Sequence, residues 1–495
     1  MRTGHGAGPG EATTRRVVAS SAPRARATAR AAVPRGATAL ASSGAATTPA
    51  GTGVATAVAE AAPRAGAPGA GAVVPAPHAV QRDASSSSDH LVKAVSALVV
   101  ALVAARISGP MGIPLGTIAT IGLAPVIVPA VRRFPLGTVL LVTVVVSIAS
   151  GLWLAMWSAT DHPHSVRLAQ DWVFHLLGLG LGVAAVLWAR TAWRDAQVAL
   201  FFGVGLLVGV AGSVSASNPW KFSLALPVTV VVLAVAWLTR RWWLECAGLL
   251  ALGGVSMVND SRSLFGMFAL AAALVAWQGW SRRPPRRGAA ARYLVLVSVL
   301  GAGVYALGQS LLLEGALGEA AQERSARQIE TSGSLLLGAR PESGAALALI
   351  AHRPWGFGLG VRPTLSEILV AKQGMAELGY DPNNGYVERY MFGGAVEVHS
   401  VVGDLWALTG IAGLVLAVVV LVVLVRGLVA GLAMRTASAL MILLCIRGLW
   451  DLFFGPLYSG LTMYTLAFGL ALVRRPAATR TDDAAPARLT GGGLS

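Results

Sequence analysis

Runs of apolar residues recur along most of the chain, from Leu91 to Arg475, separated by short polar segments. Each run is close to the ~20 residues that a helix needs to cross a bilayer. Hydropathy windows divide the region into about twelve runs, which predicts an all-α polytopic integral membrane protein with about twelve transmembrane helices. The expected spans cover residues 91–108, 112–131, 135–157, 172–189, 196–216, 222–239, 243–259, 263–280, 292–313, 400–425, 436–454 and 457–473.

The two ends of the chain lack this pattern. Residues 1–89 are rich in Ala, Gly, Pro, Thr and Arg and show neither helical nor strand periodicity, so we predict a disordered tail. The first apolar run begins too late for a signal peptide, so this tail is expected to stay in the cytoplasm. Residues 476–495 are predicted to form a second disordered cytoplasmic tail, which leaves 90–475 as the membrane domain.

Composition and charge support a membrane protein and add an orientation. Hydrophobic residues make up 55% of the chain, and the formal net charge is +16. The arginines beside the spans fall in alternate loops, as the positive-inside rule expects of cytoplasmic loops. We therefore predict a multi-pass protein of the cell (cytoplasmic) membrane with both termini in the cytoplasm. These arginines are Arg132, Arg133, Arg190, Arg194, Arg240, Arg241, Arg282, Arg283, Arg286, Arg287, Arg426, Arg435, Arg474 and Arg475.

One connection is far longer than the others. Residues 314–398, which we call the large loop, precede the tenth expected span and are predicted to be extracytoplasmic. Loops of this length are usually functional or disordered. Helix-like apolar spacing followed by "HRPWGFGLG", where Pro and Gly force turns, predicts that this one is ordered. Its alternating glycines lack the strand–helix unit of a nucleotide-binding fingerprint.

Two arginines on the expected outer side are candidates for binding an anion. Arg262 opens a span, and Arg340 lies in the large loop. A guanidinium binds phosphate through two parallel hydrogen bonds and stays charged. Arg262 alone would equally suit an arginine that reaches to the lipid headgroups. For Arg353, a salt bridge to Glu342 or Glu367 within the loop is the better interpretation.

Titratable residues gather where the large loop meets the last three expected spans. His399 suits the acceptance of a proton from a hydroxyl nucleophile, and Glu397 competes for that role. Arg447 and Asp451 are spaced i, i+4 within one span, so they can face each other on one side of a helix. Charged groups at this depth are costly unless they are paired or face a wet cavity, so this pair is expected to point into the bundle.

Other partners and cofactors find no support in the sequence. The arginines of the N-terminal tail are not interleaved with aromatic residues, so no nucleic-acid partner is expected. The two cysteines, Cys246 and Cys445, lie in separate apolar runs and are interpreted as small core residues. Neither a disulfide nor a metal site is predicted.

The combination resembles the O-antigen ligase and O-antigen polymerase superfamily of polytopic membrane glycosyltransferases. The matching features are about twelve spans, the single large loop, "SR" ending at Arg262, "GAR" ending at Arg340 with "HRPWGFGLG" after it, and "HS" at His399 with "GIAG" at Gly410–Gly413. The resemblance covers roughly Leu91 to Arg475. This sequence has Ser400 where many members carry Asn after the histidine.

The resemblance implies transfer of a glycan from an undecaprenyl-pyrophosphate lipid at the outer face of the cytoplasmic membrane, without a metal or cofactor. It implies that Arg262 and Arg340 hold the pyrophosphate, and that His399 orients or deprotonates the acceptor hydroxyl. The acceptor can be a glycan, a lipid or a protein, so ligase and polymerase both remain open. The alternative from another class is a transporter of polysaccharide or lipid-linked glycan, although the chain shows no symmetry between two halves.

Overall fold

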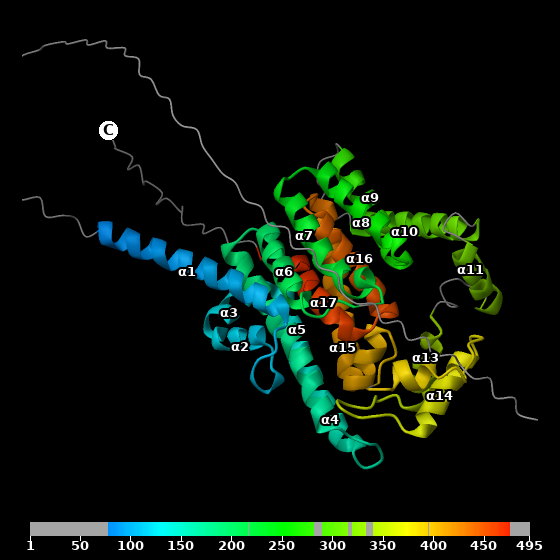
Figure 1. Cartoon of the computed structure of the whole chain (residues 1–495). Coiled ribbons are helices and arrows are strands. Elements are labelled where there is room, and N and C mark those ends of the chain that lie inside the picture. Colours follow the sequence, from blue (N-terminus) through cyan, green and yellow to red (C-terminus); the bar gives the residue numbers. More distant parts are fainter. Residues whose placement is uncertain are drawn as a thin grey trace, which may run out of the picture. The chain divides into compact units, whose positions relative to one another are not determined.

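A computed structural model describes residues 78–215, 217–281, 290–314, 319–332, 340–394 and 396–475. Both predicted tails therefore lie largely outside the described residues. The described part is all-helical and has no strand, as the apolar pattern predicted. Long helices occupy eleven of the expected spans (Figure 1). They are α1 (His78–Ala105), α4 (Pro135–Ser158), α5 (Val166–Ala192), α6 (Asp195–Val210), α7 (Ala225–Leu238), α8 (Trp242–Val258), α9 (Arg262–Trp280), α10 (Ala290–Leu313), α15 (Val401–Met434), α16 (Ala439–Phe454) and α17 (Leu457–Ala471).

Seven helical segments among the described residues are long and apolar enough to cross a membrane. They lie in α1, α4, α5, α7 with the turn before it, α9, α10 and α15. Two shorter apolar helices, α6 and α8, come close to this length. The chain thus has the helices of a membrane protein, while the number of twelve spans stays a prediction.

Two boundaries differ from the prediction. α1 begins at His78, so residues 78–89 are helical although they were assigned to the disordered tail. No Gly or Pro interrupts the chain between Pro77 and Gly109, so nothing stops the helix there. The expected span 112–131 is divided into α2 (Leu115–Gly122) and α3 (Ala124–Val131), each of eight residues. Pro125 has no N–H to continue the hydrogen bonding of α2, so the helix breaks at Leu123.

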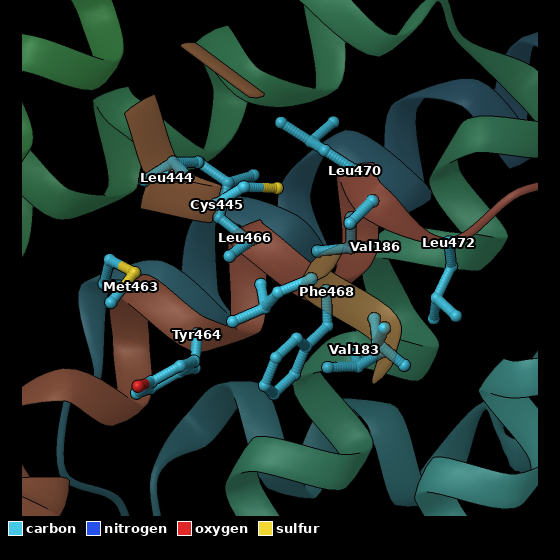
Figure 2. Packing of buried hydrophobic residues seen from close by; sticks show 14 of the residues in the cluster. Val183, Val186, Leu444, Cys445, Met463, Tyr464, Leu466, Phe468, Leu470 and Leu472 are labelled. Atoms are coloured by element: carbon cyan, nitrogen blue, oxygen red, sulfur yellow. The ribbon is translucent and has the colours of Figure 1, made fainter. Parts of the chain in front are cut away.

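The centre of the bundle is formed by α17, which packs against α5, α15 and α16. Figure 2 shows Val183 and Val186 of α5 beside Phe468 of α17 in this core. A side chain at Gly469 would collide with Val186, so this glycine permits the close approach of α5 and α17. Tyr464 donates its buried hydroxyl to the carbonyl of Gly448 on α16, at 2.7 Å. The polar groups of this core are therefore hydrogen-bonded within it.

Several of the arginines that the positive-inside rule grouped together meet at one side of the bundle. Arg190, at the end of α5, donates to the carbonyls of Gly469 and Leu472 at the end of α17. Arg435, after α15, donates to Ser281 after α9. Cations near the last carbonyls of a helix are stabilised by unpaired acceptors and by the helix dipole. We call this end of the bundle the arginine side.

The opposite end carries the large loop, and we call it the loop side. The described part of the loop contains α11 (Glu319–Ser332), α13 (Glu342–His352) and α14 (Leu365–Ala376). The buried side chains of α13, α14 and residues 387–398 form a hydrophobic cluster that also includes Trp406 of α15. The prediction that the loop is ordered agrees with the helices α13 and α14 in its described part after residue 340. Figure 1 shows α13 and α14 beside α15.

The segment 353–361 inserts between α4 and α15. α15 breaks at Gly410, where φ is 62° and ψ is −139°. The break leaves helix carbonyls without intrahelical partners, and the carbonyl of Ala407 accepts from the backbone N–H groups of Phe357 and Gly358. On α4, the carbonyl of Gly151 accepts from the N–H of Leu359. The loop is thus hydrogen-bonded to both helices through its backbone.

A polar network anchors the same loop to the turn between α4 and α5. His162, buried in that turn, lies between two carboxylates, with Nδ1 2.7 Å from Asp161 and Nε2 2.6 Å from Glu367 of α14. Arg353 donates to Asp161 at 3.2 Å and to Ser158 at 2.9 Å. The salt bridge expected for Arg353 exists, but its carboxylate is Asp161 on the α4–α5 turn and not a glutamate of the loop. This long-range partner has no local signature in the sequence.

We expect the attachment of the loop to weaken in acid. Burial acts to raise the pKa of Glu367, but hydrogen bonds from Thr364 and His162 outweigh it and hold the pKa below the ordinary 4.5. A lowered folded-state pKa stabilises the protein above the ordinary value, and this stabilisation is lost as pH falls through the lowered one. The melting temperature of the purified protein should therefore fall below about pH 4.5.

Glu367→Gln should lower the melting temperature at neutral pH and flatten its dependence on acid pH. The matched control is Glu388→Gln, since Glu388 is an exposed loop carboxylate that pairs with Lys372 and contributes little. An equally steep acid dependence in Glu367→Gln would contradict this role of Glu367.

Candidate functional site

The backbone around His399 is fixed by the start of α15. Ser400 is the N-cap of that helix: its hydroxyl accepts from the N–H of Gly403 at 3.3 Å and donates to the carbonyl of Leu452 on α16 at 3.2 Å. His399 has a φ of 54°, a left-handed conformation that is unfavourable for a residue with a side chain. The cap and its bond to α16 thus hold the histidine in a strained conformation.

Asp404 fixes the same segment from the other side. Its carboxylate is fully buried and accepts from the backbone N–H of Val398 at 2.7 Å and from that of Leu457 at 2.8 Å. Leu457 is the first residue of α17, so the negative charge also lies at the positive end of that helix dipole. One side chain therefore joins the His399 segment to the start of α17.

His399 faces residues of the large loop. Its ring centroid lies 6.2 Å from that of Tyr386, and its Nδ1 is buried with no hydrogen-bond partner among the described residues. Burial raises the pKa of Glu397, and the nearby His399 partly opposes that rise. A carboxylate with a raised pKa is a better proton acceptor than an ordinary one, so Glu397 and His399 both stay candidates for a base.

Tyr386 joins His399 to the start of α13. Its hydroxyl donates to Oε1 of Glu342 at 2.5 Å, and burial together with this hydrogen bond raises its pKa. Oε2 of Glu342 is buried and has no hydrogen-bond partner among the described residues. Two unpartnered buried polar atoms thus flank one tyrosine, where buried polar groups in proteins are otherwise almost always paired.

The positive charges of the site come from Arg340 and Arg447. Arg340 immediately precedes α13 and acts electrostatically on both Tyr386 and Asp451. Asp451 pairs with Arg447 one turn earlier on α16, at 3.5 Å. The predicted i, i+4 pair therefore exists, and it lies at the end of α16 nearest to Arg340. The structure brings five of the six predicted site residues into one cluster: Arg340, Glu397, His399, Arg447 and Asp451.

Arg262 has other partners. It lies 3.8 Å from Asp260 and donates to Ser325 of α11 at 3.4 Å. Neither partner is a predicted site residue, and the contact joins α9 to a different part of the large loop.

Sequence reasoning missed Tyr386 and the role of Glu342. Glu342 had been considered only as a salt-bridge partner, and the aromatic, polar stretch "DPNNGYVERY" around Tyr386 gave no spacing that pointed to His399. Their relevance follows from contacts that join segments far apart in the sequence.

This cluster can hold an anion beside a proton acceptor. Arg340 acts electrostatically on Tyr386 and on Asp451, the partner of Arg447, while the His399 ring lies 6.2 Å from that of Tyr386 and interacts with Glu397, whose pKa is raised. Among the described residues, no group of three His, Cys, Asp or Glu side chains is placed to bind a metal ion. No family model, curated protein or solved structure matches this chain. The functional argument therefore depends on these residues and their geometry.

Proposed function

We propose that this protein is a membrane glycosyltransferase that transfers a glycan from an undecaprenyl-pyrophosphate carrier to an acceptor hydroxyl during assembly of cell-surface polysaccharide. The observation that supports it most is that two buried atoms near Tyr386, His399 Nδ1 and Glu342 Oε2, have no hydrogen-bond partner among the described residues, while Arg340 acts electrostatically on the same tyrosine. Hydroxyl-rich glycans can satisfy such atoms, and arginine suits a pyrophosphate.

In the proposed reaction, the acceptor hydroxyl gives its proton to His399 or Glu397 while its oxygen bonds to the anomeric carbon of the donor glycan. The bond from that carbon to the pyrophosphate oxygen breaks, and the electron pair leaves with the lipid-linked pyrophosphate. Arg340, with Arg447 nearby, stabilises the charge that develops on the leaving group, which is the larger requirement for such a leaving group. Arg262 keeps its predicted role as a second pyrophosphate ligand on sequence grounds alone.

The location in the membrane follows from the substrates. The carrier's lipid stays in the bilayer, while its glycan and the acceptor meet at the loop side, which we assign to the outer face with both termini in the cytoplasm. A long polyprenyl chain then needs no extraction from the membrane before reaction.

The proposal is tested by measuring undecaprenyl-pyrophosphate-linked glycan and mature surface glycan in a host that lacks this protein. We expect lipid-linked glycan to accumulate and surface glycan to fall, with rescue by wild type but not by His399→Ala. His352→Ala is the matched control, because His352 is an exposed histidine at the end of α13 in the same loop and should rescue fully.

Equal membrane amounts of the variants must accompany this comparison. Rescue by His399→Ala would contradict the assigned role of His399. Surface glycan that falls without accumulation of lipid-linked glycan on the outer leaflet would favour the transporter. Accumulated long glycans would identify a ligase, whereas accumulated single repeat units would identify a polymerase.

A further inference from the structure

A second partly buried cation, Arg106, lies on the loop side. Arg106 follows the last residue of α1 and has a φ of 50°, a left-handed conformation. Its guanidinium donates a long hydrogen bond of 3.4 Å to Thr462 of α17. Within the described residues, no carboxylate lies within ion-pair distance of it. A guanidinium remains charged when it is partly buried.

Arg106 lines a cavity of about 40 Å³ between α1, α5 and α17. Its polar lining consists of Arg106, His175, Thr117, Thr462 and Thr465, and the rest of the wall is apolar. A space of this size holds about three waters, which is roughly the size of a phosphate group. Few convergent polar groups in a mostly apolar wall are typical of a ligand site.

The orientation of His175 in the cavity wall is fixed by two contacts, which leave its Nε2 as an acceptor for a P–OH hydrogen of a protonated phosphate. Its Nδ1 lies 2.6 Å from the carbonyl oxygen of Asp171, which can only accept, so the proton is on Nδ1. Its ring also packs on Tyr458, with centroids 4.6 Å apart. The imidazole is thus fixed by its own helix and by the start of α17.

Tyr458 connects this cavity with the His399 site. The Tyr458 side chain lies within electrostatic reach of both Arg106 and Glu397, and Glu397 in turn interacts with His399. Arg106 and Arg340 each lie within electrostatic reach of a tyrosine near the candidate bases. Tyr458 lies between Arg106 and Glu397 in this respect, and Tyr386 lies between Arg340 and His399.

We propose that the Arg106 cavity is a second phosphate-binding site, which takes the phosphate group of a lipid-linked acceptor while Arg340 takes that of the donor. The phosphate site is argued from geometry alone, whereas its assignment to the acceptor rests on the proposed function. Its consequence is that both substrates carry a phosphate and approach His399 from within the membrane.

The test counts bound lipids on the full-length protein in phosphatidylcholine nanodiscs by native mass spectrometry. The probes are undecaprenyl phosphate, phosphatidylglycerol and inorganic pyrophosphate. Wild type should bind two molecules of undecaprenyl phosphate. Arg106→Gln and Arg340→Gln should each bind one, and their affinity for a second molecule should be at least tenfold weaker than that of wild type. Arg106→Lys should retain part of the binding because it keeps the charge.

Arg167→Gln is the matched control, because Arg167 is an exposed arginine at the start of α5 on the loop side, and it should bind two. A melting curve for each variant separates lost binding from lost folding. Unchanged binding of the carrier, of phosphatidylglycerol and of inorganic pyrophosphate by a folded Arg106→Gln would overturn the site. If Arg106→Gln lost binding of phosphatidylglycerol or inorganic pyrophosphate but still bound two molecules of undecaprenyl phosphate, the phosphate site would stand. Its assignment to a lipid-linked acceptor would be overturned.

Failure of this inference is distinguishable from failure of the proposed function. Two bound carriers that depend on Arg106 and Arg340, without any glycan transfer by wild type, would overturn the function and leave the site. Glycan transfer by wild type, with unchanged binding of all three probes by Arg106→Gln, would overturn the site and leave the function.

Discussion

Alanine in place of Gly358 is expected to destabilise the protein by about 3 kcal/mol and to detach the large loop from the bundle. Gly358 has a φ of 108°, which residues with side chains rarely adopt. A side chain there would collide with the backbone of Leu154 and Ala155 on α4. Backbone atoms of a helix cannot rotate away as the end of a side chain can. The loop therefore has to leave its place between α4 and α15.

The measurement is the melting temperature of purified protein, together with protease cleavage within residues 340–394. Gly394→Ala is the matched control: Gly394 lies in the same loop, is exposed, and would bring a new side chain within 4 Å of nothing. A large drop for Gly358→Ala and none for Gly394→Ala is the expected pair of results. Similar melting temperatures for both variants would show that the close approach of the loop to α4 is unimportant.

The three alternating glycines of the segment 353–361 show which features a local sequence pattern can reveal and which it cannot. The alternation of Gly356, Gly358 and Gly360 marks a special backbone, and all three glycines have a positive φ. The purpose of the glycines depends on α4, α15 and the start of α5, whose backbones all approach the segment. Contacts between segments far apart along the chain leave no periodic trace in one sequence.

The helices were the most predictable part of the fold. A span is specified by a local property, its apolar length. Eleven of the expected ranges therefore correspond to helices, and the majority of the predicted ends lie within a few residues of the observed ones. The exception, 112–131, depends on one proline that windowed hydropathy does not weigh. The start of α1 was missed because polar composition was interpreted as disorder, although the segment contains no helix breaker.

The candidate site was predictable in its charged members and less so in their surroundings. Ionisable residues are rare within spans, so the Arg447–Asp451 pair stands out, and His399 and Arg340 stand out as titratable or cationic residues on the expected outer side. Tyr386 and Arg106 do not, because a tyrosine in a polar loop and an arginine at a helix end are ordinary by composition. The place of Tyr386 between Glu342 and His399, and that of Arg106 in a cavity wall, appear only in the structure.

Replacement of Asp404 by asparagine is expected to lower stability by about 2 kcal/mol and to reduce glycan transfer at the same time. The two carboxylate oxygens accept from the N–H groups of Val398 and Leu457, and both bonds are buried. An amide has one oxygen, so its NH₂ group would face one of these donors and leave that donor unpaired. The segment that carries His399 would then lose its link to α17.

Melting temperature and glycan transfer, measured together, distinguish a residue that positions His399 from a residue that takes part in the reaction. His399→Ala should abolish transfer at nearly unchanged melting temperature, because its Nδ1 has no protein partner to lose within the described residues. Asp404→Asn should lower both quantities, since Asp404 is fully buried and its carboxylate joins the backbone next to His399 to the start of α17. Glu388→Gln, an exposed carboxylate in the large loop, should change neither. An Asp404→Asn protein that melts like wild type but does not transfer glycan would instead assign Asp404 a direct part in the reaction.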